Sequence, residues 1–230
     1  MGEKKRKEAT VKTWKKALFV AAAILFIVVM VVSSMGTNWI SGIAPVKAGD
    51  SVLVDYTIYD STGRPFLTTD QQVYKEQVAK GASLLFAKQL TLTANQSFRQ
   101  ALYPVMVYSP VNGGSYQEFA LYNPEFTAIS NAVVGMKTNE KKKVILPTSG
   151  TMTTLLSQED LEKTQIDIKS LETGDSLLLG VSENPESMAG NTSAVSYVRL
   201  AQVVRVSDAG VVVDFGYPSV DVTVVQSSHQ

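Results

Sequence analysis

The side chains that carry most enzyme chemistry are nearly absent from this sequence. The 230 residues include no cysteine and a single histidine, His229, next to the C-terminus. This composition excludes a serine–histidine–aspartate triad and a zinc site built from cysteine and histidine. The serines and carboxylates have spacings typical of turns and helix caps, and no pair of acids suggests general acid–base catalysis. The sequence therefore predicts no metal site and no bound cofactor.

Aromatic and aliphatic side chains beside strand-like segments remain as candidates for binding. In SVLVDYTIYD, residues 51–60, apolar side chains recur at every second position and include Tyr56, which indicates a β-strand. The turn sequence DSTGRP ends this strand, and Phe66 follows it directly. Phe126 and Ile129 precede the stretch NAVVGMKTNEKKKVILP, which has the pattern of a short helix, a turn and a strand.

Local signals predict several further elements that would position these side chains. In TTDQQVYKEQVAKG, Thr69 or Asp70 is the expected helix N-cap, and Gly81 the expected C-terminal stop. Ser157 and Asp160 resemble a capping box at the start of another helix. Two β-branched runs joined by SDAG predict a hairpin, and VDVTVVQ predicts a last strand.

The N-terminal part has a different character. Residues 1–16 carry seven Lys and Arg against two Glu, whereas the remainder has an excess of acidic residues. The uncharged run Ala17–Met35 follows, and as a helix it would rise about 28 Å, close to the hydrocarbon thickness of a bilayer. These features predict a single-pass membrane helix, with the N-terminus in the cytoplasm and the rest of the chain outside the cell membrane. A cleaved signal peptide is the competing interpretation. The positive charge gathers on this arm, not on a folded domain, so no nucleic-acid partner is expected.

These patterns predict an α+β protein in several parts. The parts, in chain order, are a basic arm at 1–16, a transmembrane helix at 17–36, a tether at 37–47, and a domain formed by 48–147 and 200–230 with insertions at 67–124 and 148–199.

The segments VKAGDSVLVDYTIYDSTGRPF and AISNAVVGMKTNEKKKVILP resemble the FKBP family of peptidyl-prolyl isomerases. The later order VVRVSDAGVVVDFGYP resembles the SlyD-type branch, which carries an insert-in-flap domain. The resemblance implies a twisted antiparallel sheet crossed by a helix, with two insertions. It also implies that Val133, Val134 and Met136 face the sheet, while the lysines 141–143 lie at the solvent.

The resemblance further implies a prolyl pocket formed by Tyr56, Phe66, Phe126 and Ile129. Such a pocket accelerates rotation about the prolyl C–N bond, whose barrier is about 20 kcal/mol, by removing water from the amide. The family has an aspartate after the phenylalanine, where this chain has Leu67, so the polar groups that orient the substrate are reduced. An ordinary core role for the four side chains is the competing interpretation.

Two functions from different classes follow from these expectations. The first is a membrane-anchored, extracytoplasmic folding factor with weak isomerase activity, whose clients are unfolded or proline-containing polypeptides held by residues 148–198. The second is a non-catalytic scaffold or accessory subunit of a membrane protein complex, because fold alone does not determine activity. In both, the lipid bilayer would hold residues 17–36.

Overall fold

The computed structural model describes residues 22–31, 33, 44–109, 114–163, 166–182 and 197–228. It divides into two compact units, Met1–Ile43 and Ala44–Gln230. The basic arm and His229 lie outside the described residues.

The expectation of a single-pass membrane protein is wrong. In the first unit the described helical residues are 22–31 and 33. Ten helical residues rise about 15 Å, roughly half of what a bilayer requires. In the part of the chain that the structure describes, no helix has both the length and the apolar character needed to cross a membrane. The remaining residues of the expected span 17–36 lie outside that part.

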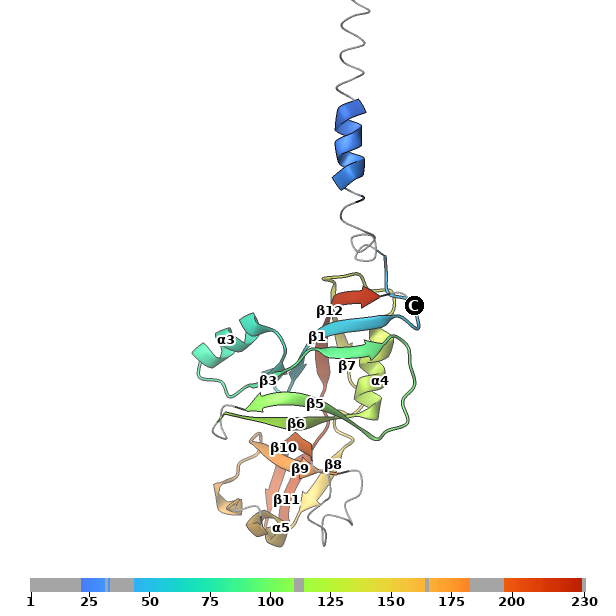
Figure 1. Ribbon diagram of the computed structural model, residues 1–230. Coiled ribbons are helices and arrows are strands. Elements are labelled where there is room, and N and C mark those ends of the chain that lie inside the picture. The colour runs from blue at the N-terminus through green and yellow to red at the C-terminus, as the bar shows by residue number, and fades with distance from the viewer. Residues whose placement is uncertain are drawn as a thin grey trace, which may run out of the picture. The chain divides into compact units, whose positions relative to one another are not determined.

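The described strands of the second unit form one curled sheet of twelve strands (Figure 1). Its order is β7-β12-β1-β2-β3-β5-β6-β10-β11-β8, with β4 paired to β1 and β9 paired to β10. The strands are β1 Ser51–Tyr59, β2 Pro65–Thr68, β3 Leu85–Ala87, β4 Leu90–Thr93, β5 Leu102–Ser109, β6 Ser115–Tyr122, β7 Lys141–Ile145, β8 Thr153–Leu156, β9 Ser176–Val181, β10 Tyr197–Ser207, β11 Gly210–Asp214 and β12 Ser219–Ser228. The helices are α3 Gln71–Ala79, α4 Asn123–Ala132 and α5 Gln158–Lys163, with a short 3₁₀ turn at Ile168–Ser170.

The expected fold class is also wrong about the sheet. We expected an antiparallel domain sheet that carries an insertion at 67–124, with residues 148–199 as a separate insert-in-flap-like domain. Instead, β3 and β5 from the first insertion and β8 and β9 from the second belong to the same sheet. Two of the junctions, β2 with β3 and β6 with β10, are parallel. Pairing of this kind satisfies strand edges that separate insertions would leave open.

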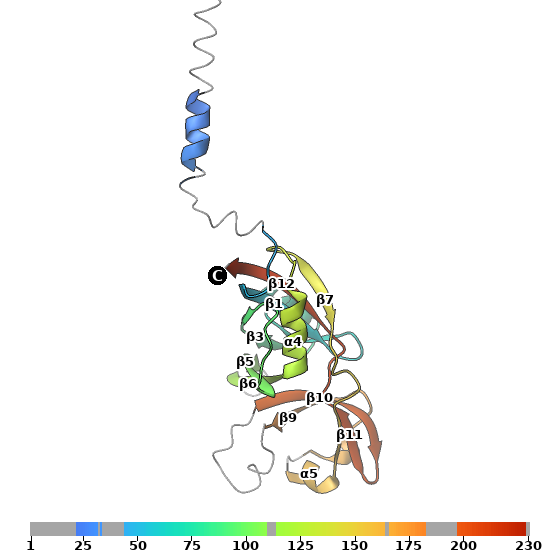
Figure 2. The same cartoon turned by 90° about the vertical axis from the view of Figure 1, so that its right-hand side faces the viewer.

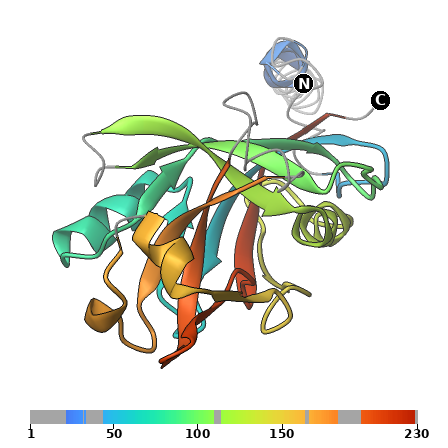
Figure 3. The same ribbon diagram turned by 90° about the horizontal axis from the view of Figure 1, so that it is seen from below.

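Two apolar cores lie along this sheet. We call β1–β7, α3, α4 and β12 the main lobe, whose core includes Val54, Phe119 and Val222. We call β8–β11 and α5 the small lobe, whose core includes Ala201 and Val213. Figures 1 and 2 show the small-lobe strands gathered at one end of the unit. Figure 3 shows α3 standing out to one side, and no residue of this helix is buried.

The predictions that depend on neighbouring residues in the sequence are confirmed. In β1 the alternation places Tyr56 and its every-second neighbours in the interior. Helix α3 begins after Asp70, whose carboxylate accepts the N–H groups of Gln72 and Val73, as an N-cap should. The capping pair also forms: the Ser157 N–H donates to Asp160, and the Asp160 N–H donates to the Ser157 hydroxyl. The predicted hairpin is β10–β11.

The stretch NAVVGMKTNEKKKVILP contains the last two residues of α4, a turn and β7, so most of the helix lies before it. Val133 and Met136 are buried as expected. Val134 is 39% exposed, because α4 has ended and the chain turns through Gly135 with a φ of 83°. In this turn the side chain of Val133 packs into the core, whereas that of Val134 lies toward solvent.

The three lysines of β7 do more than face solvent. The Lys141 ammonium lies 2.9 Å from Asp221 of β12. Lys142 donates to the carbonyl of Ala132 at the C-terminal end of α4, where the helix dipole favours a cation. The Lys143 ammonium lies over the ring of Tyr59. The lysines therefore fasten β7 to its neighbours, while their charges protect the outer edge of the sheet.

Stability should fall at alkaline pH partly through Tyr59. Burial, together with the hydrogen bond to Asp221 and the charge of that residue, raises the pKa of Tyr59 to about 12. An unfolded tyrosine has a pKa of about 10. The contribution of Tyr59 to the free energy of unfolding is therefore complete below pH 10 and is lost as the pH rises through about 12. Tyr59→Phe should therefore show a smaller loss of stability over this interval in urea unfolding. Equal losses in both proteins would contradict this assignment.

Candidate functional site

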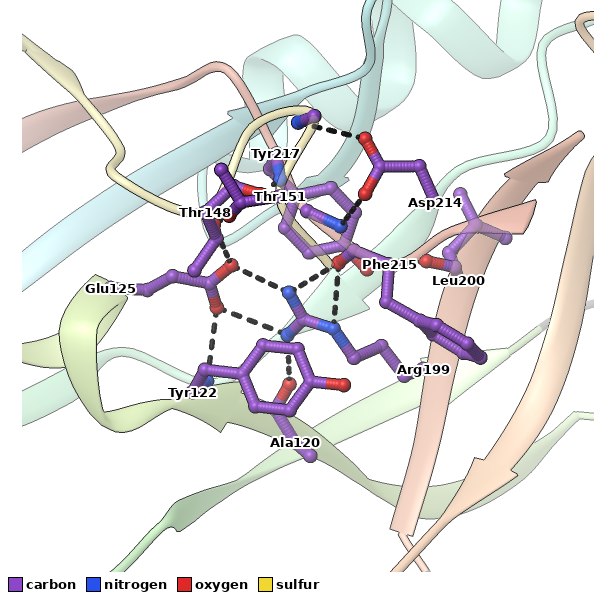
Figure 4. A network of polar contacts seen from close by, with 12 residues as sticks. Ala120, Tyr122, Glu125, Thr148, Thr151, Arg199, Leu200, Asp214, Phe215 and Tyr217 are labelled. Atoms are coloured by element: carbon purple, nitrogen blue, oxygen red, sulfur yellow. Dashed lines mark hydrogen bonds and ion pairs between the residues drawn. The ribbon is translucent and has the colours of Figure 1, made fainter. Parts of the chain in front are cut away.

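A buried ion pair joins the two lobes. Arg199 lies on β10 and Glu125 in the first turn of α4, and neither side chain is exposed to solvent. Two hydrogen bonds connect them, from Nη1 to Oε2 at 3.0 Å and from Nη2 to Oε1 at 2.5 Å (Figure 4). Paired bonds of this kind are the strongest arrangement of a guanidinium with a carboxylate.

The remaining donors of Arg199 reach two backbone carbonyls. Its Nε and Nη2 donate to the carbonyl oxygen of Phe215, at 2.9 and 2.6 Å. Its Nη1 also donates to the carbonyl of Ala120 on β6, at 2.6 Å. Every N–H donor of the guanidinium therefore has an acceptor. This matters because a buried cation is tolerated only when it is paired and fully hydrogen-bonded.

Glu125 is equally well provided with partners. Oε1 accepts the hydroxyl of Thr148 at 2.6 Å, and Oε2 accepts the N–H of Tyr122 at 3.0 Å. Tyr122 is the N-cap of α4, so the carboxylate satisfies a donor that the start of a helix leaves unpaired. Four separate segments of the chain thus meet at one carboxylate and its arginine.

Two tyrosine rings enclose the guanidinium. The Arg199 Cζ lies 3.9 Å from the ring centroid of Tyr122 and 4.3 Å from that of Tyr217. These are cation–π distances in a site without solvent. Burial alone would lower the pKa of Arg199, but Tyr217 and Glu125 outweigh it and raise the pKa. The arginine is therefore a permanent cation.

The surface beside this network is hollowed. The hollow has a volume of about 420 Å³. It is lined by Leu102, Tyr122, Thr151, Met152, Thr153, Thr154, Gly180, Val181, Ser182 and Phe215. No charged side chain is among them, and apolar groups share the wall with hydroxyl groups. Tyr122 and Phe215 belong both to this wall and to the ion-pair network.

Two strands with open edges flank the hollow. In the described residues β8 pairs only with β11, and β9 pairs only with β10. The Phe215 N–H bonds to the Met152 carbonyl, in register with the β8–β11 ladder. Because bonding alternates along an antiparallel pair, the N–H groups of Thr153 and Leu155 point away from β11. They are therefore directed to the open side of β8.

The four residues of the expected prolyl pocket all lie in the interior. Tyr56, Phe66, Phe126 and Ile129 are 0–6% exposed, and none lines the hollow. The Tyr56 hydroxyl is buried and has no hydrogen-bond partner among the described residues.

Phe66 and Phe126 belong to different aromatic groups. The Phe66 ring lies 4.5 Å from Tyr217 and 6.3 Å from Phe119. The Phe126 ring stacks on Tyr103 at 3.9 Å and meets Phe98 edge-on at 4.4 Å. Tyr217 thus occupies the space beside Phe66.

The sequence analysis missed Arg199, although a signal for it exists. In YVRLAQVV the arginine takes a position that alternates with Ala201 and Val203, both buried. A charged residue on the inward side of an apolar strand requires a buried partner. The sequence does not say that this partner is Glu125, 74 residues earlier.

Comparisons with known proteins do not assign the chain. No protein-family model and no curated protein matches the sequence. Among the described residues, no cluster of three or more histidine, aspartate or glutamate side chains could hold a metal ion. The hollow and its neighbouring strands are the features of the described residues that point to a function.

Replacing Arg199 alone should be costly. Arg199→Met leaves Glu125 buried without its cation, and breaking a buried pair typically costs about 3–5 kcal/mol. Arg205→Met is the matched control, because Arg205 lies on the same strand but is exposed, and its cost should stay within about 0.5 kcal/mol. Urea unfolding measures both. Similar costs for the two variants would show that the pair does not carry the stability assigned to it.

Proposed function

We propose that the protein is a folding factor that binds extended, apolar segments of polypeptide in the hollow between β8 and β9. The observation that carries the proposal is an uncharged hollow of about 420 Å³ beside two strands with open edges. An extended segment could hydrogen-bond to an open strand edge and place alternate side chains in the hollow.

The open edges differ in a way that supports this proposal. β7 also ends the sheet, but its sequence is KKKVI, and lysines are a common means of preventing strand addition. β8 reads TTLL and β9 reads SLLLGV, with no charge in either. A fourth strand with one described partner, β4, reads LTLT and is also uncharged, but none of its residues lines the hollow. The two edges beside the hollow thus lack the protection that β7 has.

The wall of the hollow favours apolar side chains over charged ones. Met152, Val181 and Phe215 offer apolar surface, and methionine adapts its shape to different neighbours. No side chain in the wall could neutralise a charge, and burying an unpaired charge is expensive. The absence of basic side chains from the wall also disfavours nucleic acid, whose binding depends on phosphate neutralisation.

The resemblance to the FKBP-type isomerases also supports a role in folding. Its SlyD-like branch carries a client-binding insertion, and residues 148–199 of this chain contain β8 and β9. Under this proposal the clients are unfolded or proline-containing polypeptides, bound without catalysis or with weak isomerase activity.

A non-catalytic binding module with one dedicated partner is the second candidate. The observation that favours it is the burial of Tyr56, Phe66, Phe126 and Ile129. A module of this kind would use the same strand edges for one partner sequence instead of many.

Peptide binding should depend on the outward amide of Thr153. The probe is a fluorescein-labelled peptide of alternating valine and threonine, added to the full chain. Thr153→Pro removes the N–H and should weaken binding about tenfold or more, whereas Thr153→Val keeps the N–H and should bind as the unchanged protein does. Met152→Glu should weaken binding through the apolar wall, and Met152→Leu should not.

Two controls decide the outcome of this experiment. The same peptide with N-methyl groups at alternate residues cannot pair with a strand edge and should not bind. Equal binding of the methylated peptide, or of Thr153→Pro, would contradict strand addition. If the chain binds no peptide and instead forms dimers at rising concentration, the edges serve a second copy and the proposal fails.

Isomerase activity should be weak or absent. The full chain should not accelerate cis–trans isomerisation of an Ala-Leu-Pro-Phe peptide beyond a small factor, because Tyr217 fills the space beside Phe66. A protease-coupled assay measures the rate. A large acceleration that Phe66→Ala abolishes, while Val224→Ala leaves it intact, would contradict this expectation and place a working site in the main lobe.

A further inference from the structure

We infer that Arg199 is a positioning residue for polypeptide binding: it fixes the walls of the hollow on both sides without touching the bound segment. The inference rests on the proposed function and identifies the residue on which the shape of that site depends. Arg199 itself does not line the hollow.

The first wall held in this way is Tyr122. Its ring lies 3.9 Å from the Arg199 Cζ, and its N–H donates to Glu125. The ring is thus held through the guanidinium, and its backbone through the carboxylate. A tyrosine at the end of β6 without these contacts would be free to turn toward solvent and close the hollow.

The second wall is Phe215 with the segment that faces it. The Phe215 carbonyl accepts two hydrogen bonds from Arg199, and its N–H donates to the Met152 carbonyl. Thr148 donates to Glu125, and the Thr151 hydroxyl donates to the Thr148 carbonyl. The start of β8 is therefore tied to the ion pair from both directions (Figure 4).

The opposite wall belongs to β9, and Arg199 positions it through the backbone. Arg199 stands opposite Leu179 in the β9–β10 ladder. The next pairs in register are Val198 with Gly180 and Tyr197 with Val181, and both β9 residues line the hollow. Arg199 thus lies between β8 and β9. Its side chain holds the Phe215 connection on the β8 side, and its backbone pairs with β9.

Stability and positioning can be separated by experiment. Two apolar side chains of similar size often replace a buried ion pair with little loss of stability, or even a gain. They cannot donate to the carbonyls of Phe215 and Ala120 or stack as a cation on Tyr122. The double variant Arg199→Met with Glu125→Leu should therefore restore the fold without restoring the hollow.

The test compares four variants of the full chain with the unchanged protein: R199M, E125L, the double variant R199M/E125L, and V224A. Val224 is buried in the main lobe on β12 and does not line the hollow. Each protein is measured for its urea midpoint and for its affinity for the fluorescein-labelled valine–threonine peptide, at a temperature where it is folded. The double variant should regain a midpoint near that of the unchanged protein, yet bind the peptide about tenfold more weakly or worse. V224A should lose stability and keep its affinity within about twofold.

A double variant that binds the peptide as the unchanged protein does would overturn the inference. A peptide affinity that falls in proportion to the urea midpoint in every variant would overturn it as well. If the double variant does not fold, R199K takes its place, because an ammonium keeps the charge but cannot make the paired bonds. Failure of the unchanged protein to bind the peptide would refute the proposed function separately. The positioning role then has its own readout: with 3-fluorotyrosine incorporated, the ¹⁹F signal of Tyr122, assigned through Tyr122→Phe, should shift or broaden in R199M/E125L. An unchanged signal would overturn the inference in that case.

Discussion

The need to neutralise one buried guanidinium constrains much of this structure. Removing a cation and an anion from water costs several kcal/mol each, and only complete pairing recovers that cost. Arg199 achieves complete pairing only when β10, the start of α4 and the Phe215 connection are all in place. The main and small lobes therefore have one mutual arrangement in which the pair is satisfied. A pair of this kind is weak evidence for extra stability, but it is a strong condition on geometry.

The hollow follows from that arrangement and from the shape of the sheet. The sheet passes from the main lobe through β6 and β10 into the small lobe, where β8 and β9 each keep one open edge in the described residues. Open edges are usually protected, and β7 shows the usual means with its lysines. β8 and β9 carry no charge and flank the uncharged hollow, and the binding function that we propose accounts for this combination. The same reasoning separates this site from the buried aromatic groups around Phe66 and Phe126, which serve as core.

How much the sequence predicted depends on how far apart the interacting residues are. The alternation of β1, the Asp70 cap, the Ser157–Asp160 pair and the β10–β11 hairpin all depend on residues within a few positions of one another, and these predictions are confirmed. The ion pair joins residues 74 positions apart, and no local pattern encodes that contact. Strands of the insertions joined the main sheet for the same reason, since strand pairing is decided by the whole fold. The apolar run and the basic arm before it predicted a membrane helix, but the described helical residues are too few to span a bilayer.

Addition of a polypeptide to the open edge of β8 can be measured by amide exchange of the ¹⁵N-labelled full chain with the valine–threonine peptide. The peptide should slow exchange at Thr153 and Leu155, whose N–H groups point to the open side. Thr154, whose N–H points toward β11, should change little. Slower exchange along Lys141–Ile145 in place of β8, or no change at any amide, would show that no polypeptide adds to β8.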